Sequence, residues 1–132
     1  MKKYGIKIKG IVKCEDDFLI VKKWYNDRID EPYQWEFLDT NLADGETPEA
    51  TCIRYIQECT GIFTHISSMP YTWVYRLGDN QYLGLAFICK VIDELVILSE
   101  ELYDYKWVRA EDLPNYIKNK YILEDLRRAR VI

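Results

Sequence analysis

A short helix with well-marked ends is the feature that most constrains how this chain of 132 residues can fold. Thr47 stands before Pro48 and Glu49, which is typical of a helix N-terminus where threonine caps the helix and proline takes the first helical position. Gly61 predicts the C-terminus, because glycine readily adopts the left-handed conformation that ends many helices. Strand-like segments flank this helix on both sides, so we expect it to pack on a β-sheet.

Most of the remaining chain has the patterns of strands. Residues 4–14 alternate between apolar residues and lysines, which predicts a strand with one buried face, and residues 18–25 predict a second strand that forms a hairpin with it. This order predicts one α+β domain over residues 1–132, with a mixed sheet and helices packed on it. Further strands are expected at 33–38, 62–77, 81–92 and 105–108, with loops at 26–32 and 39–46 and a C-terminal helix over 113–130.

Charge and cysteine usage exclude several classes of protein. The chain has 18 Lys and Arg against 22 Asp and Glu, a net charge of −4, which argues against a nucleic-acid coat protein with its basic surface. No apolar run approaches the roughly 18 residues of a membrane span, and residues 1–10 lack the apolar core of a signal peptide. Cys14, Cys52, Cys59 and Cys89 form no C-x-x-C pair, so we expect a cytoplasmic protein with reduced, buried thiols.

Residues 35–62 contain a spaced set of charged, aliphatic and glycine residues. Trp35-Glu36-Phe37 leads into a loop. Six of the residues that follow it match fixed positions of the pattern G-x5-E-x7-R-E-U-x-E-E-x-G-U, where U is a bulky aliphatic residue. The segment resembles the Nudix box of MutT-like Nudix hydrolases, and residues 99–113 are similar to a downstream stretch of that family. The six matching residues are Glu46, Arg54, Ile56, Glu58, Gly61 and Ile62.

The resemblance implies a fold, a reaction and a set of site residues. The fold would be the Nudix fold, with the mixed sheet sandwiched between α-helices. The reaction would be cleavage of the pyrophosphate in a nucleoside diphosphate linked to a further group X, with Mg²⁺ or Mn²⁺ as cofactor. Glu58 would be a metal ligand, and Glu46 with Arg54 a supporting salt bridge. Glu101 would be the downstream acid that serves as ligand or general base, with Glu100 and Asp104 as alternatives.

Three departures from the pattern bear on that chemistry. Thr40 stands where the first glycine belongs, Tyr55 replaces the glutamate after the arginine, and Cys59 replaces the second glutamate of the pair. Mg²⁺ prefers oxygen ligands, thiolates suit softer metals, and a tyrosine brings no charge at neutral pH. We therefore expect weak binding of Mg²⁺ or Mn²⁺. Two hypotheses follow: a Nudix pyrophosphohydrolase with weakened metal binding, or a Nudix-fold protein that binds a nucleotide without hydrolysing it.

Residues before the box are candidates for binding the ligand. Tyr33 and Trp35 could stack on a nucleobase, a contact worth roughly 1–3 kcal/mol, although Trp35 could equally pack in the core. Arg28 could meet a phosphate or another edge of the substrate. Asp39 could repel a phosphate or supply an oxygen ligand. The expected partner is a small nucleotide-type molecule, with no membrane, and exposed tyrosines would also suit a homodimer interface.

Overall fold

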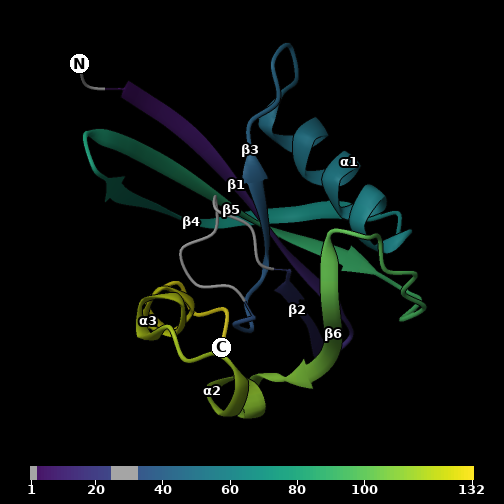
Figure 1. The fold of residues 1–132 in the computed structure, drawn as a ribbon. Coiled ribbons are helices and arrows are strands. Elements are labelled where there is room, and N and C mark those ends of the chain that lie inside the picture. Colours follow the sequence, from purple (N-terminus) through teal and green to yellow (C-terminus); the bar gives the residue numbers. More distant parts are fainter. Residues whose placement is uncertain (1–2, 25–32) are drawn as a thin grey trace.

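The computed structural model describes residues 3–24 and 33–132, which form a mixed sheet with helices on both faces (Figure 1). This arrangement confirms the α+β class expected from the order of the elements. None of the helices in the described ranges is long and apolar enough to cross a membrane. The elements are β1 (Lys3–Cys14), β2 (Asp17–Lys23), β3 (Leu38–Asn41), α1 (Pro48–Thr60), β4 (His65–Leu77), β5 (Asn80–Val91), β6 (Leu102–Arg109), a 3₁₀ turn (Ala110–Asp112), α2 (Leu113–Tyr116) and α3 (Lys120–Arg128).

Strand β1 lies at the centre of the sheet and pairs with three other strands. The strand order is β4-β5-β1-β2-β6, and β3 pairs with β1 as an additional strand. β1 runs parallel to β5 along its whole length, whereas its pairings with β2 and β3 are antiparallel. β3 pairs with residues 7–10 of β1, so the short segment that carries Asp39 and Thr40 is anchored to the middle of the sheet.

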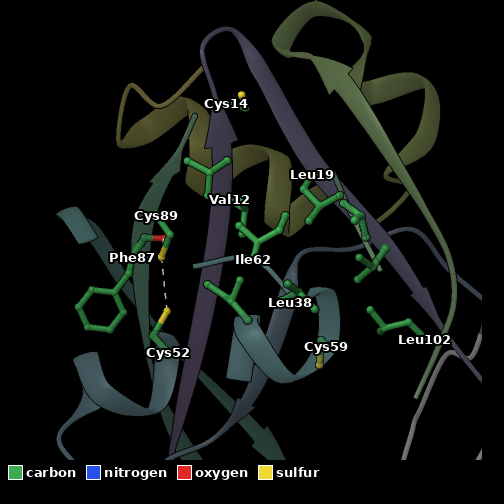
Figure 2. Packing of buried hydrophobic residues seen from close by; sticks show 14 of the residues in the cluster. Val12, Cys14, Leu19, Leu38, Cys52, Cys59, Ile62, Phe87, Cys89 and Leu102 are labelled. Carbon is green, nitrogen blue, oxygen red and sulfur yellow. Dashed lines mark hydrogen bonds between the residues drawn. The ribbon is translucent and has the colours of Figure 1, made fainter. Parts of the chain in front are cut away.

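Apolar side chains fill both faces of the sheet. On the face that α1 covers, Figure 2 shows Cys52 of α1 pointing toward Cys89 of β5, and their thiols lie 3.5 Å apart. The opposite face packs against α2 and α3. The expectation that β1 has one buried face is therefore wrong, since Lys9 is 5% exposed and Ile11 is fully buried beneath the C-terminal helices.

Helix α1 begins and ends where the sequence predicts. Thr47 Oγ1 accepts a hydrogen bond from the Ala50 amide at 3.1 Å, and Pro48 is the first helical residue. Gly61 has the left-handed φ of 74°, and its amide donates to the Gln57 carbonyl. These caps satisfy backbone groups that an uncapped helix would leave without partners, so they fix the position of the helix along its axis.

Gly10 of β1 sets how closely α1 approaches the sheet. A Cβ at this position would lie 2.7 Å from Ile56 Cδ1 and 3.3 Å from Cys52 Sγ, both buried side chains of α1. We expect Gly10→Ala to lower the free energy of unfolding by about 1–2 kcal/mol, because overpacking a core forces side chains from their preferred rotamers. Urea denaturation followed by circular dichroism would measure this, and an unchanged midpoint would contradict it.

Two elements differ from their predicted positions. The strand expected at 33–38 is instead β3, Leu38–Asn41, and the preceding segment contributes a single bridge between Glu36 and Val21. The expected helix over 113–130 is broken, because Ile117 is extended and Asn119 caps a new helix by accepting from the Tyr121 amide. Asparagine favours such caps over helix interiors, which explains the break. The expected loop at 26–32 lies outside the described residues.

Candidate functional site

Arg54 of α1 joins Glu46, the salt-bridge partner that the resemblance implies, to Glu58, the implied metal ligand. Its guanidinium donates to Glu46 through Nε and Nη2, both at 2.9 Å, and to Glu58 Oε1 through Nη1 at 2.9 Å. Thr51 Oγ1 also donates to Glu46, and hydrogen bonding to Arg54 holds the pKa of that carboxyl below its ordinary value. The structure thus brings Glu46, Arg54 and Glu58 together at the start and outer edge of α1.

Glu58, the predicted metal ligand, faces solvent. Its side chain is 60% exposed, and one carboxylate oxygen is already bound by Arg54. An exposed pair of residues four positions apart on a helix contributes only a few tenths of a kcal/mol, about 0.3–0.5, to stability. The carboxylate could therefore turn toward a ligand at little cost in stability.

Tyr55 and Cys59 form an uncharged pair on the same edge of α1. Burial raises the pKa of Cys59 to about 11, against the opposing effects of a hydrogen bond with Tyr55 and the charge of Lys23. Burial also raises the pKa of Tyr55, which is half-buried. Both groups are neutral at pH 7, so this edge lacks two of the negative charges that the family pattern would supply.

Glu101 lies next to this edge, immediately before β6. Its Oε2 is 4.0 Å from Cys59 Sγ. The loop before it is held against the C-terminus of α1, because the amides of Ile97 and Ser99 donate to the carbonyls of Thr60 and Cys59, each at 2.9 Å. Among the three candidate acids, Glu101 is the one that the structure describes in contact with the residues of the box.

A partly buried ionic cluster at the end of β2 was not predicted. Lys23 Nζ lies 2.6 Å from Asp39 Oδ1, 3.2 Å from the Asp39 carbonyl and 3.2 Å from Glu36 Oε1, and its side chain is 17% exposed. Burial opposes ionisation of all three groups, but the Lys23 ammonium holds the pKa of Asp39 below its ordinary value. Burial and the charge of Asp39 raise the pKa of Glu36 despite its contact with Lys23.

This cluster changes the interpretation of Asp39. Its Oδ1 accepts a hydrogen bond from Lys23, so the ammonium offsets the negative charge of Asp39 and occupies one of its two carboxylate oxygens. The charge of Lys23 also influences the pKa values of Tyr55 and Cys59, which places the ammonium near the inner edge of α1. The signal in the sequence is a lysine that ends an apolar strand, with acidic residues at the next strand.

The aromatic candidates separate into two groups. Tyr33 is 45% exposed, and the centre of its ring lies 5.5 Å from the centre of the Tyr103 ring. Trp35 instead packs on the opposite face of the sheet, edge-on to Tyr116 at 6.1 Å, with Lys22 Nζ 4.6 Å from its ring. Arg28 lies outside the described residues.

The donor atoms at this site fit a divalent cation poorly. Within residues 3–24 and 33–132, no group of three or more His, Cys, Asp or Glu side chains is arranged to hold a metal ion. Glu58 and Glu101 place carboxylates at the edge of α1 that carries the neutral Tyr55 and Cys59, and the cationic Lys23 lies nearby. A pair of Mg²⁺ ions requires several anionic oxygens, which this set does not supply.

Comparisons with known proteins agree on one family. The family model of the NUDIX domain matches residues 7–126. A nucleoside triphosphatase, NudI, from Klebsiella pneumoniae (strain 342) is 32% identical over 120 residues, which cover 83% of this chain and 84% of that protein.

Solved structures share the fold at lower identity. The MutT protein from Methanosarcina mazei Go1 superposes with a TM-score of 0.84 at 21% identity, covering 98% of this chain and 94% of that one. An Ap4A hydrolase from C. elegans, solved as a binary complex, has a TM-score of 0.78 at 18% identity and covers 96% of both chains.

Proposed function

Since this chain belongs to the Nudix family, we propose that it binds a nucleoside phosphate at the edge of α1 and that metal-dependent hydrolysis there is weak or absent. Nudix hydrolases generally use divalent metal ions. The observation that carries the proposal is the neutral Tyr55–Cys59 pair in place of two glutamates, beside a Glu58 held by Arg54. Mg²⁺ or Mn²⁺ would be bound weakly, through Glu58 and the phosphates of the ligand.

The class of ligand follows from the family and the charges. NudI is named as a nucleoside triphosphatase and the C. elegans protein as an Ap4A hydrolase. Both names refer to substrates in which a nucleoside carries a chain of phosphates. Among the residues that the structure describes, Arg54 and Lys23 place cations near the edge of α1. Phosphate oxygens accept charge-assisted hydrogen bonds from such groups, so a ligand could be held without a metal.

A second candidate is slow hydrolysis of the pyrophosphate in a nucleoside diphosphate linked to X. The specific observation in its favour is that Glu46, Arg54 and Glu58 remain joined and that Glu101 lies beside them. In that case Glu58 would be the residue on which turnover depends.

One set of measurements separates the two candidates. Nucleoside triphosphates, ADP-ribose, dinucleoside polyphosphates and sugar nucleotides would be tested by calorimetry and by a phosphate-release assay, each with Mg²⁺, with Mn²⁺ and with EDTA. We expect binding in EDTA without turnover, and the same affinity in Glu58→Gln. The control variant is Glu49→Gln, at an exposed position in the first turn of α1. Turnover that is abolished by Glu58→Gln but retained in Glu49→Gln would establish the hydrolase instead.

Three further expectations remain proposals. We propose that residues 1–132 act as one domain, that the protein is cytoplasmic, and that its exposed tyrosines could form a homodimer interface. All four cysteines are free and buried, as a reducing compartment would favour.

A further inference from the structure

The outer edge of β4 pairs with no other strand of the described residues. β4 ends the strand order of the sheet on one side, and β6 ends it on the other. Edge strands present backbone groups that can pair with another chain, and proteins block this pairing with bulges, prolines and charged side chains. β6 has such protection, because it carries Asp104, Lys106 and Arg109. β4 is protected along only part of its length.

The two halves of β4 differ in the features that block pairing. In the first half, the pairing with β5 shifts register twice before Tyr71, and Pro70 lies within the second shift. Residues 71–77 instead pair with β5 without a shift. This half contains no proline or lysine, and Arg76 is its one charged residue. The second half of β4 is therefore a regular edge that a further strand can join.

An exposed apolar row crosses the sheet and ends at this edge. Val74 of β4 pairs with Leu83 of β5, which pairs with Ile6 of β1, so the three side chains lie in line on one face. They are 58%, 42% and 38% exposed, respectively. Two residues further along β1, Ile8 belongs to the core beneath α1. The row thus lies on the face that α1 covers, but beyond the helix, where the β4–β5 hairpin extends away from it (Figure 1).

The aromatic side chains on the opposite face leave the edge open. Trp73 packs on Gly84 of β5, so closely that an added Cβ there would overlap its ring. Tyr75 stacks on Tyr82, also of β5, with the ring centres 4.9 Å apart. Both rings lie inward over the neighbouring strand, so neither extends across the outer side of β4.

We infer that a second copy of this chain pairs with residues 71–77, strand to strand and antiparallel, about a two-fold axis at Val74. This pairing includes all seven residues, and it is self-complementary, as a symmetric dimer requires. It places Arg76 of each copy opposite Thr72 of the other, so no like charges meet. It also joins the two apolar rows into one strip across both copies. The dimer does not depend on nucleotide binding, and it gives the homodimer proposed above a defined surface.

Sedimentation equilibrium of the nucleotide-free protein tests this inference. We expect the mass to rise from that of one chain to that of two between about 1 and about 300 µM, as suits a small interface. Val74→Lys would place two ammonium groups opposite each other on the axis, so the dimer should weaken at least about tenfold. Val74 is exposed, so the variant should fold, which circular dichroism would check. Ile92→Lys, the matched change at an exposed position after β5, should leave the dimer unchanged.

Two changes at Thr72 test the register. Thr72→Glu would place a carboxylate opposite each Arg76 and should strengthen the dimer by about threefold to tenfold. Thr72→Lys would place like charges there and should weaken the dimer by a similar factor. Thr72 is exposed on β4, so both variants change charge with little effect on the core.

Other outcomes contradict the inference in different ways. A monomer at every concentration would overturn the inference and leave the proposed nucleotide binding standing. A dimer that persists in Val74→Lys, or that responds equally to both changes at Thr72, would lie on another surface and also overturn the inference. A mass that rises beyond two chains would indicate an open assembly and overturn the two-fold pairing. A dimer that binds no nucleotide would overturn the proposed function alone.

Discussion

Replacing both Tyr55 and Cys59 with glutamate is expected to raise the affinity for Mn²⁺ about 100-fold. The two new carboxylates would lie on the edge of α1 beside Glu58 and Glu101, where the wild-type residues are neutral. At 4 Å and an effective dielectric of about 20, each charge attracts a cation by several kcal/mol, of which desolvation removes the larger part. After this cost, we expect each carboxylate to raise the affinity for Mn²⁺ about tenfold.

The same double variant should be less stable without metal. Cys59 is 1% exposed, so its replacement by glutamate would place a charge in a buried position, and the pKa of the new carboxyl should be raised. We expect the melting temperature of Tyr55→Glu/Cys59→Glu to fall without metal and to recover with Mn²⁺, because a ligand that binds only the folded state stabilises it. Calorimetry and thermal denaturation would measure the two effects.

Tyr55→Gln/Cys59→Gln is the matched control for charge. It introduces polar groups of similar size with no negative charge, so we expect no gain in metal affinity. If the glutamate variant also gains nothing while it remains folded, the missing acids are not the cause of the weak metal binding that we propose. The charge of Lys23 would then be the dominant obstacle, since it acts on both positions.

The ends of α1 could be predicted from the sequence because their signals are local. Thr47 and Pro48 act on the backbone of the first turn, and Gly61 acts on the last, without help from distant residues. The contact between Glu46 and Arg54, eight residues apart, is one that the resemblance to the Nudix box implies. Both features are retained in this chain although three box positions have changed.

The cluster around Lys23 could not be predicted in the same way. Lys23 and Asp39 are 16 residues apart, and their contact depends on how β2 and β3 both flank β1. The burial of Lys9 has a similar origin, because the alternation in β1 places it on a face that the sequence pattern assigns to solvent. The helices that cover this face follow about a hundred residues later in the chain.

Lys23→Met is expected to lower the free energy of unfolding by about 2–3 kcal/mol at pH 7. Removal of one partner of a fully buried ion pair costs about 3–5 kcal/mol, and a smaller value is expected here because Asp39 is 32% exposed. Lys22→Met is the matched control on the same strand. Lys22 contacts the Trp35 ring and forms no ion pair with an acidic residue of the described chain, so its loss should cost about 1 kcal/mol or less.

The loss in Lys23→Met should depend on pH, with a sign that the pKa shifts determine. The pKa of Asp39 is lowered in the folded protein, so its contribution to stability is present above its ordinary pKa of 3.8 and is lost as the pH falls through the folded value. Glu36 has a raised pKa, so its ionisation works against the fold as the pH rises above 4.5. Without Lys23 both carboxylates would lack their cation at neutral pH and would be neutralised in acid.

Urea denaturation of the wild-type protein and Lys23→Met at pH 4 and pH 7 would measure this dependence. The difference in unfolding free energy between them should be largest at pH 7 and should shrink at pH 4, where protonation relieves the unpaired carboxylates. An equal difference at both values would mean that Lys23 stabilises the fold through its hydrocarbon chain alone. In that case Asp39 would not be neutralised by Lys23, and its carboxylate would again be available to a metal or opposed to a phosphate.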